Sequence, residues 1–143
     1  MELISDRFGS ISLGWVAPNV YLVRASGEIS ASLGALQLSR LEAALEAQPL
    51  MRYFSDCREL RGYDLLARSN FVRFVLAQRK KFAELTLLTW SDGMSAAGQA
   101  FASAIGDPLV LLSSPSEFDR RLFLAAPRVR EALTANEHRL SAH

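Results

Sequence analysis

The stretch LTLLTW at residues 85–90 decides the fold class. It is almost continuously apolar, and a strand of this kind is usually buried on both faces, as in a parallel sheet. A second apolar strand, LVLL at residues 109–112, follows a segment with helical spacing. Strands that alternate with helices need crossover connections, which build a mostly parallel sheet. These residues therefore predict an α/β fold.

An antiparallel hairpin is predicted at the start of the chain. Residues 8–16 and 20–25 are rich in strand-forming side chains, and the turn Ala17-Pro18-Asn19 joins them. The hairpin would add an antiparallel edge to the sheet, which makes the predicted sheet mixed. The free edge of residues 8–16 is expected either to be covered or to recruit another chain.

Helices are predicted on both sides of a short central strand, Met51–Ser55, which Asp56 closes. The helix before it is expected to start at Ser30 or Ser32, either of which can cap it, and to run to about Ala47.

The helix after the central strand is predicted over residues 65–83, following a loop at 58–63. Its apolar face is expected to comprise Phe71, Val72, Val75, Leu76 and Phe82. Phe74 projects away from that face beside Arg73. An exposed aromatic next to an arginine is typical of an interface anchor.

Further helices are predicted towards the end of the chain. One has apolar residues at helical spacing from Met94 to Ile105, and Gly106 suits its end. Ser114, Pro115 and Glu117 match a capping box with proline at the first helical position. Four to five helices are expected in a single domain of residues 1–143, with a core at about 8–125, a helix at 127–137 and a frayed tail.

Composition excludes several function classes. The chain has 143 residues and a formal net charge of +1, so no overall field attracts it to nucleic acid. No stretch approaches the length of a membrane span, and the N-terminus does not resemble a secretory signal, so a cytoplasmic location is expected. The lone Cys57 cannot form an intramolecular disulfide and is expected to be a small buried side chain.

Three segments, taken in order, resemble the STAS domain, the fold of bacterial anti-sigma-factor antagonists. They are VYLVRASGEI at 20–29, YFSD at 53–56, and the strand at 109–112 with its following helix at 114–122. The resemblance implies a non-catalytic protein–protein interaction module in bacterial regulation or signalling. It also implies a regulatory protein partner, bound through the loop and helix after the central strand.

One departure from the family concerns phosphorylation. In anti-sigma-factor antagonists an Asp-Ser pair opens the helix after the central strand, and that serine is phosphorylated. The resemblance places the aspartate at Asp64 and the serine at Leu65, with Leu66 next. Leucine cannot accept phosphate, so the kinase-controlled switch is expected to be absent or moved. Ser69 is the nearest hydroxyl and the candidate substitute.

The candidate contact surface combines the loop, the helix and a turn near residue 92. Its predicted partner-binding residues, for a regulatory protein or for a second copy in a homodimer, are Arg58, Arg61, Tyr63, Asp64, Arg73, Phe74, Asp92 and Met94. Arg68 lies four residues after Asp64, the spacing of helix neighbours, and is expected to pair with Asp64 or Asp56.

An alternative function is small-molecule or lipid binding. Residues 96–104 form a slim, alanine-rich helix, which permits close packing or an apolar pocket lined by Trp90, Met94 and Phe101. No enzyme is predicted, because the only histidines are His138 and His143, both in the tail. No cofactor is expected, and no cluster of ligands at metal-binding spacing is present in the sequence.

Overall fold

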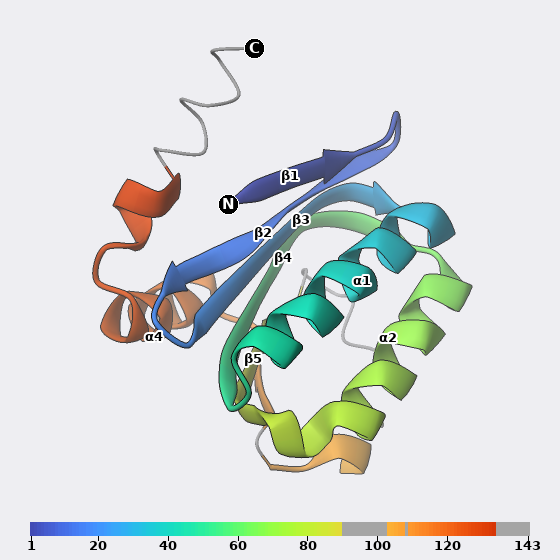
Figure 1. Ribbon diagram of the computed structural model, residues 1–143. Coiled ribbons are helices and arrows are strands. Elements are labelled where there is room, and N and C mark those ends of the chain that lie inside the picture. Colours follow the sequence, from blue (N-terminus) through green and yellow to red (C-terminus); the bar gives the residue numbers. More distant parts are fainter. Residues whose placement is uncertain (90–102, 108, 134–143) are drawn as a thin grey trace.

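The computed structural model describes residues 1–89, 103–107 and 109–133, and a six-stranded sheet runs through them in the order β1-β2-β3-β4-β5-β6 (Figure 1). The strands are β1 Glu2–Ser5, β2 Gly9–Ala17, β3 Val20–Ile29, β4 Met51–Tyr63, β5 Phe82–Leu88 and β6 Leu109–Leu112. The pairs β1–β2 and β2–β3 are antiparallel, and the remaining pairs are parallel. The predicted mixed, mostly parallel sheet is therefore confirmed.

The helices cover both faces of the sheet. Helix α1, Ala31–Ala47, and helix α2, Leu65–Gln78, pack together on one face (Figure 1). Helix α4, Pro115–Ala125, lies on the other face, and residues 129–133 continue as a helical turn. No helix of the described residues is long and apolar enough to cross a membrane.

The larger core lies under α1 and α2 and is centred on Tyr53. The ring of Tyr53 is fully buried and lies within 6.4 Å, centroid to centroid, of the rings of Tyr21, Phe71 and Phe82. Its hydroxyl accepts a hydrogen bond from the Nε2 atom of buried Gln37 at 3.3 Å. This bond satisfies a polar group that would otherwise be costly to bury.

A smaller core lies under α4. Phe54 of β4 meets Phe118 of α4 edge-to-face at 5.9 Å, and neither ring is exposed. Leu22, Leu122 and Val129 complete the contact between this helix and the sheet. Successive residues of a strand face opposite sides, so Tyr53 and Phe54 supply the two cores in turn.

Two helix starts and one helix end follow the capping signals in the sequence. Ser30 Oγ accepts a hydrogen bond from the backbone N–H of Leu33, and Ser114 Oγ accepts one from Glu117. The side chain of Glu117 pairs with Arg120 instead of returning to the cap, so only half of the predicted capping box forms. Gly106 has a φ of +62°, the left-handed conformation expected after a helix.

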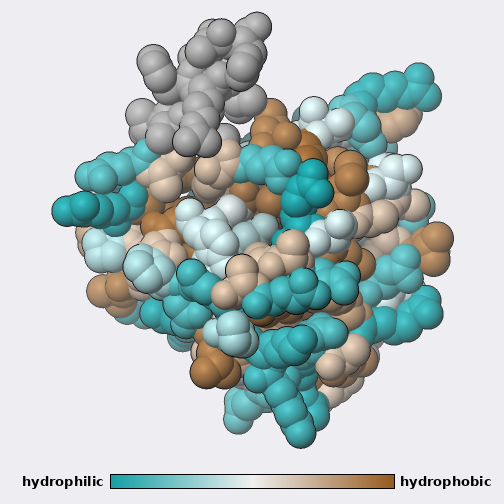
Figure 2. Space-filling model, viewed as in Figure 1, coloured by the Kyte–Doolittle hydropathy of each residue, from teal (hydrophilic) through white to brown (hydrophobic). Residues whose placement is uncertain are grey.

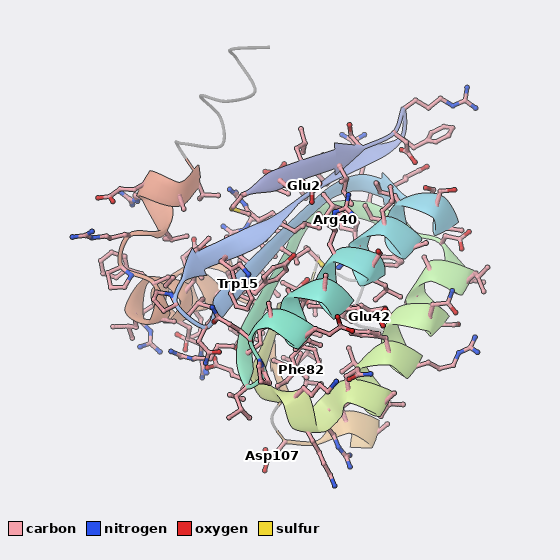
Figure 3. All side chains as sticks on the ribbon, in the orientation of Figure 1. Glu2, Trp15, Arg40, Glu42, Phe82 and Asp107 are labelled. Atoms are coloured by element: carbon pink, nitrogen blue, oxygen red, sulfur yellow. The ribbon has the colours of Figure 1, made fainter. Side chains whose placement is uncertain are left out.

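The antiparallel part of the sheet has one more strand than predicted. Strand β1, Glu2–Ser5, pairs along β2 and occupies the sheet edge that was expected for residues 8–16. Only Ile4 of this strand is buried, which is too weak a pattern to reveal a strand in the sequence. Arg40 of α1 reaches Glu2 of β1 at 2.7 Å and links this edge to the helix layer (Figure 3).

Strand β4 is longer than predicted. The prediction of a loop at residues 58–63 was wrong, because these residues belong to the strand. The strand continues to Tyr63 because β3 is also long, and the two run side by side with register irregularities after Arg24 and after Gly27. Each irregularity changes which face of the sheet the following side chains point to. Leu60 is therefore buried although apolar and polar residues do not alternate regularly along this strand.

Helix α2 ends earlier and turns differently from the prediction. It stops at Gln78, a 3₁₀ turn follows at Arg79–Lys81, and Phe82 begins β5 instead of completing the helix face. Phe74 packs against the core, while Leu76 is 39% exposed. The expectation of Phe74 as an exposed anchor was therefore wrong.

The close contact between the two helices sets the rotation of α2. A side chain at Gly34 of α1 would put its Cβ 2.7 Å from the Cβ of Ala67, so the backbones approach there as only glycine permits. With Ala67 buried at this crossing, the inward stripe of α2 continues one and two turns later through Phe71, Phe74 and Val75. The outer surface of α1 and α2 is mainly hydrophilic with scattered hydrophobic patches (Figure 2).

Candidate functional site

The ends of β3 and β4 and the starts of α1 and α2 meet at one end of the sheet. The backbone N–H of Asp64, after β4, donates to the carbonyl of Ile29, at the end of β3, at 2.9 Å. Asp64 Oδ1 then accepts from the N–H groups of Leu66 and Ala67 at 2.9 and 3.1 Å. One residue thereby closes the strand and caps the helix, which fixes the first turn of α2.

A hollow of about 230 Å³ lies at this end of the molecule. Its lining comes from the β1–β2 turn and from the chain leaving β3 and β4: Phe8, Glu28, Ile29, Ser30, Gly62, Tyr63 and Asp64. Asp6 holds the turn in place, because its carboxylate accepts from the N–H groups of Phe8 and Gly9 and from the hydroxyl of Ser30. These hydrogen bonds lower the pKa of Asp6 below its ordinary value.

Large apolar side chains are exposed around this end. Leu65 and Leu66, in the first turn of α2, are 70% and 58% exposed, and Phe8 is 55% exposed. The guanidinium of Arg7 lies 4.7 Å from the centre of the Phe8 ring. We name Phe8, Arg61, Leu65 and Leu66, with half-exposed Tyr63, the α2 entry surface.

Only some of the predicted partner-binding residues lie on the α2 entry surface. Arg61 and Tyr63 do, and Asp64 lines the neighbouring hollow. Tyr63 donates to Gln37 Oε1 at 3.3 Å, which fixes its ring. Burial raises the pKa of the Tyr63 hydroxyl above its ordinary value. Arg73 is exposed further along α2 and contacts Asn70 at 3.4 Å. Phe74 is packed inward, as described, and Asp92 and Met94 lie outside the described residues.

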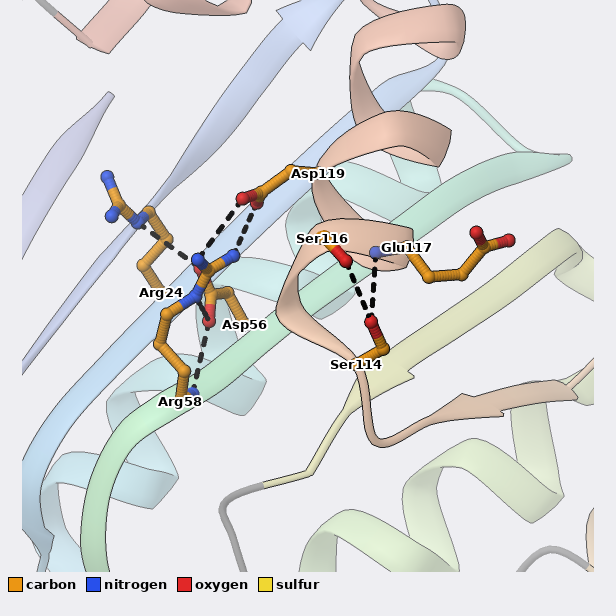
Figure 4. Close-up of polar contacts among 7 residues, drawn as sticks. All are labelled: Arg24, Asp56, Arg58, Ser114, Ser116, Glu117 and Asp119. Atoms are coloured by element: carbon orange, nitrogen blue, oxygen red, sulfur yellow. Dashed lines mark hydrogen bonds and ion pairs between the residues drawn. The ribbon is translucent and has the colours of Figure 1, made fainter.

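Arg58 belongs to a different region, on the α4 side of the sheet. Its Nε donates to Asp56 Oδ1 at 3.0 Å, and both of its terminal nitrogens reach Asp119 of α4 (Figure 4). These two carboxylates raise the pKa of the Arg58 guanidinium. Arg58 therefore fastens α4 to the sheet.

The ion pairs expected for Arg68 are replaced by others. Within the described residues no ion pair joins Arg68 to Asp56 or Asp64, and Arg68 is exposed on α2. Asp56 instead contacts Arg24 and Arg58, because β4 carries its side chain to the face opposite α2. The capping role of Asp64 already engages one of its carboxylate oxygens.

Two further side chains concern phosphorylation and thiol reactivity. Ser69, the candidate phosphorylation site, is exposed on α2. Cys57 is half-buried, and its sulfur lies 3.6 Å from the Ser55 hydroxyl. Burial of the thiol raises the pKa of Cys57 to about 11, so the reactive thiolate is scarce near neutral pH.

The predictions on metal binding and on an apolar pocket concern different parts of the chain. Among residues 1–89, 103–107 and 109–133, no group of three or more His, Cys, Asp or Glu side chains is placed to hold a metal ion. The apolar pocket expected around Trp90, Met94 and Phe101 lies outside the described residues, as does the tail with His138.

Comparison with solved structures identifies the fold. The chain is similar to an uncharacterized protein of the DUF3478 family with a SpoIIAA-like fold from Shewanella loihica PV-4. The match has a TM-score of 0.63 at 17% sequence identity and covers 83% of this chain and 98% of the other.

This chain has the SpoIIAA-like fold. The likeness to anti-sigma-factor antagonists inferred from three short segments is confirmed at the level of the fold. No protein-family model matches the sequence, and no curated protein matches it. Two chains with 17% sequence identity share this architecture, because many different side chains can satisfy the same pattern of burial.

Proposed function

We propose that this protein is a non-catalytic regulatory module that binds a protein partner through the α2 entry surface. The observation that carries the proposal is the pair of neighbouring leucines, Leu65 and Leu66, left exposed in the first turn of α2. Scattered single apolar residues are ordinary on a protein surface, but adjacent ones beside an exposed aromatic form the core of a small interface.

The α2 entry surface is rigid enough to bind without rearrangement. Asp64 caps the helix that carries both leucines, and Asp6 fixes the turn that carries Phe8. A preorganised surface loses little conformational entropy on binding. Full burial of one leucine contributes about 1.5–3 kcal/mol, so two would supply a useful share of a micromolar affinity.

The SpoIIAA-like fold supports a regulatory role for this module. Leu65 occupies the position that the family resemblance assigns to a phosphorylated serine. We infer that the partner meets an apolar contact there, and that occupancy of the surface, instead of phosphorylation at residue 65, controls binding.

The test compares two variants in affinity purification from the source organism. Leu65→Asp/Leu66→Asp introduces charge on the α2 entry surface, while Leu124→Asp places a charge on α4, where Leu124 is 67% exposed. Acidic residues suit the first turn of a helix, so the double variant is expected to fold.

The expected result is a protein retained by the native chain and by Leu124→Asp but lost with the double variant. The purified pair should then show at least a tenfold weaker Kd for the double variant in isothermal titration calorimetry. Equal retention by all three chains would show that the α2 entry surface is not the contact.

A further inference from the structure

A groove crosses the sheet on the face opposite α1 and α2. It consists of two hollows, of about 150 and 500 Å³, that share Arg24, Asp56 and Arg58. The smaller hollow lies over β2 and β3 and is lined by three serines and by Glu59, and the larger runs between the sheet and α4. We name the two together the Arg24 groove. It is separate from the α2 entry surface.

Arg24 is the cation at the junction of the two hollows. Its Nε lies 3.7 Å from Asp56 Oδ2, which is longer than a hydrogen bond, and its side chain is 45% exposed. Arg58, in contrast, is engaged on both sides by Asp56 and Asp119 (Figure 4). Because a guanidinium carries five N–H donors, Arg24 keeps the capacity to bind a carboxylate with two parallel hydrogen bonds.

Both aspartates that line the groove with Arg24 are hydrogen-bonded to Arg58. Asp56 accepts from the backbone N–H and from the Nε of Arg58 at 3.1 and 3.0 Å. If Arg24 turned towards an incoming anion, Asp56 would therefore keep two hydrogen bonds and would not be left as an unpaired buried charge. Arg24 has one long contact with Asp56, whereas Arg58 has hydrogen bonds to two carboxylates, so Arg24 is the arginine that is better placed to bind an anion.

Serine hydroxyls surround the polar end of the groove. The sheet register places Ser10 opposite Ser26, and Ser12 opposite Arg24, on one face of β2 and β3. Ser10, Ser12 and Ser26 are half-buried, and their side chains have no hydrogen bond to another of the described residues. Three hydroxyls beside an arginine can donate to a second oxygen of the same anion.

Beyond Arg24 and Arg58 the larger hollow is mainly apolar, and Ser116, Asp119, Arg120 and Arg130 also line it. The larger hollow is lined there by side chains from β3, from α4 and from the turn after it: Leu22, Leu122, Phe123, Val129 and Leu133. Phe123 is 55% exposed, so a bound apolar group would cover its ring. A volume of about 500 Å³ falls within the range of small-molecule sites.

The geometry points to a binding site for a small organic carboxylate with an apolar body. The carboxylate would pair with Arg24 and accept hydrogen bonds from the serine hydroxyls, while the apolar body would lie against Leu122, Phe123 and Val129. A single groove that has an exposed arginine at its centre and apolar side chains along its larger hollow matches the two halves of such a ligand.

The probe for the test is naphthalene-2-carboxylate, titrated into the ¹⁵N-labelled protein and followed by NMR. We expect saturable binding, with the largest shifts at the amides of Arg24 and Phe123. Naphthalene-2-carboxamide, which lacks the charge, and acetate, which lacks the apolar body, should each bind at least ten times more weakly. Equal binding of the acid and the amide would overturn the proposal, as would shifts confined to other parts of the chain.

Two variants identify the residues responsible. Arg24→Gln should weaken naphthalene-2-carboxylate binding at least tenfold and leave the weak amide binding unchanged. The matched control is Arg73→Gln, an exposed arginine on α2, which should leave the Kd unchanged. An unaltered Kd in Arg24→Gln, with thermal unfolding like that of the native chain, would refute the role of Arg24.

The groove and the proposed function are tested separately. Leu65→Asp/Leu66→Asp alters the other face of the molecule and should bind naphthalene-2-carboxylate as the native chain does. Loss of protein partner binding would therefore leave the Arg24 groove unaffected, and failure of the carboxylate titration would leave the α2 entry surface unaffected.

Discussion

Asp56 shows how one buried carboxylate can organise a whole face of a sheet. Only 5% of it is exposed, yet it contacts Arg24 and Arg58, and Arg58 in turn holds Asp119 of α4. A buried charge is tolerated when its hydrogen bonds are satisfied, and removing one partner of such a pair is destabilising. Asp56 therefore carries both stability and the arrangement of the Arg24 groove.

Replacement of Asp56 by asparagine tests this role. Asparagine keeps an acceptor for the backbone N–H of Arg58 but loses the charge that faces two guanidinium groups. We expect the free energy of unfolding in urea to fall by about 2 kcal/mol.

The control is Asp119→Asn, because Asp119 is mostly exposed and an exposed ion pair contributes less than about 1 kcal/mol. Equal losses in the two variants would show that the burial of Asp56 adds nothing to its interaction.

At the level of the elements, the crossing of α1 and α2 depends on a single missing side chain. The Cβ of an alanine at position 34 would lie 2.7 Å from the Cβ of Ala67, which no real contact permits. Alanine is the better helix former by about 1 kcal/mol, so propensity alone predicts that Gly34→Ala stabilises the protein. Packing predicts the opposite, because overpacking costs about 1–3 kcal/mol.

We expect packing to prevail, so that Gly34→Ala lowers the free energy of unfolding by about 1 kcal/mol after its gain in helix propensity. The second variant, Gly34→Ala/Ala67→Gly, moves the small residue to the other helix and should recover part of the loss. A double-mutant cycle measured by urea unfolding gives the coupling. Additive effects of the two substitutions would place the helices further apart than described.

The elements also show what local sequence can and cannot predict. Ser30, Ser114 and Gly106 mark helix ends through contacts within one turn, and those predictions are confirmed. The predicted length of β4 and the predicted inward face of α2 were wrong because each depends on a distant partner. For β4 the partner is the long strand β3 beside it, and for α2 it is Gly34 on the neighbouring helix. Such contacts cannot be predicted from the pattern of residues within one element.

The candidate site, like the fold, could be predicted from the sequence only in part. Tyr63 and Asp64 line one hollow at the end of β4, and the role of Arg61, Tyr63 and Asp64 in partner binding stays a prediction. Phe8 was missed, because it reaches the site through the pairing of β1 with β2, and Ile4 alone gave little sign of β1. The exposure of Leu65 and Leu66 depends on the rotation of α2, which the contact of Gly34 with Ala67 sets.

For the whole molecule, the buried hydroxyls and thiol predict sensitivity to alkali. Burial raises the pKa of Cys57 from 9.0 to about 11 and that of Tyr21 from 10.0 to about 12, and it raises the pKa values of Tyr53 and Tyr63 above 10.0. As the pH rises, these groups lose their protons in the unfolded chain before they lose them in the folded one. Deprotonation then lowers the free energy of the unfolded state alone, which destabilises the fold. Stability is full below pH 9 and falls as the pH rises through 9 to 12.

The free energy of unfolding, measured in urea at pH 8 to 11, should therefore begin to decrease near pH 9. In Cys57→Ala the onset should move towards pH 10, because only the tyrosines of this group remain. A constant free energy across this range in the native chain would contradict the burial of these groups.

The strand order has a consequence for how the chain acquires its structure. Each strand pairs with the one that immediately precedes it in the sequence, so no later segment must insert between two earlier ones. The β1–β2–β3 meander can form from local contacts alone, and every subsequent crossover adds one strand at a growing edge. Synthesis from the N-terminus supplies the strands in the order in which the sheet accepts them, which suits folding during translation.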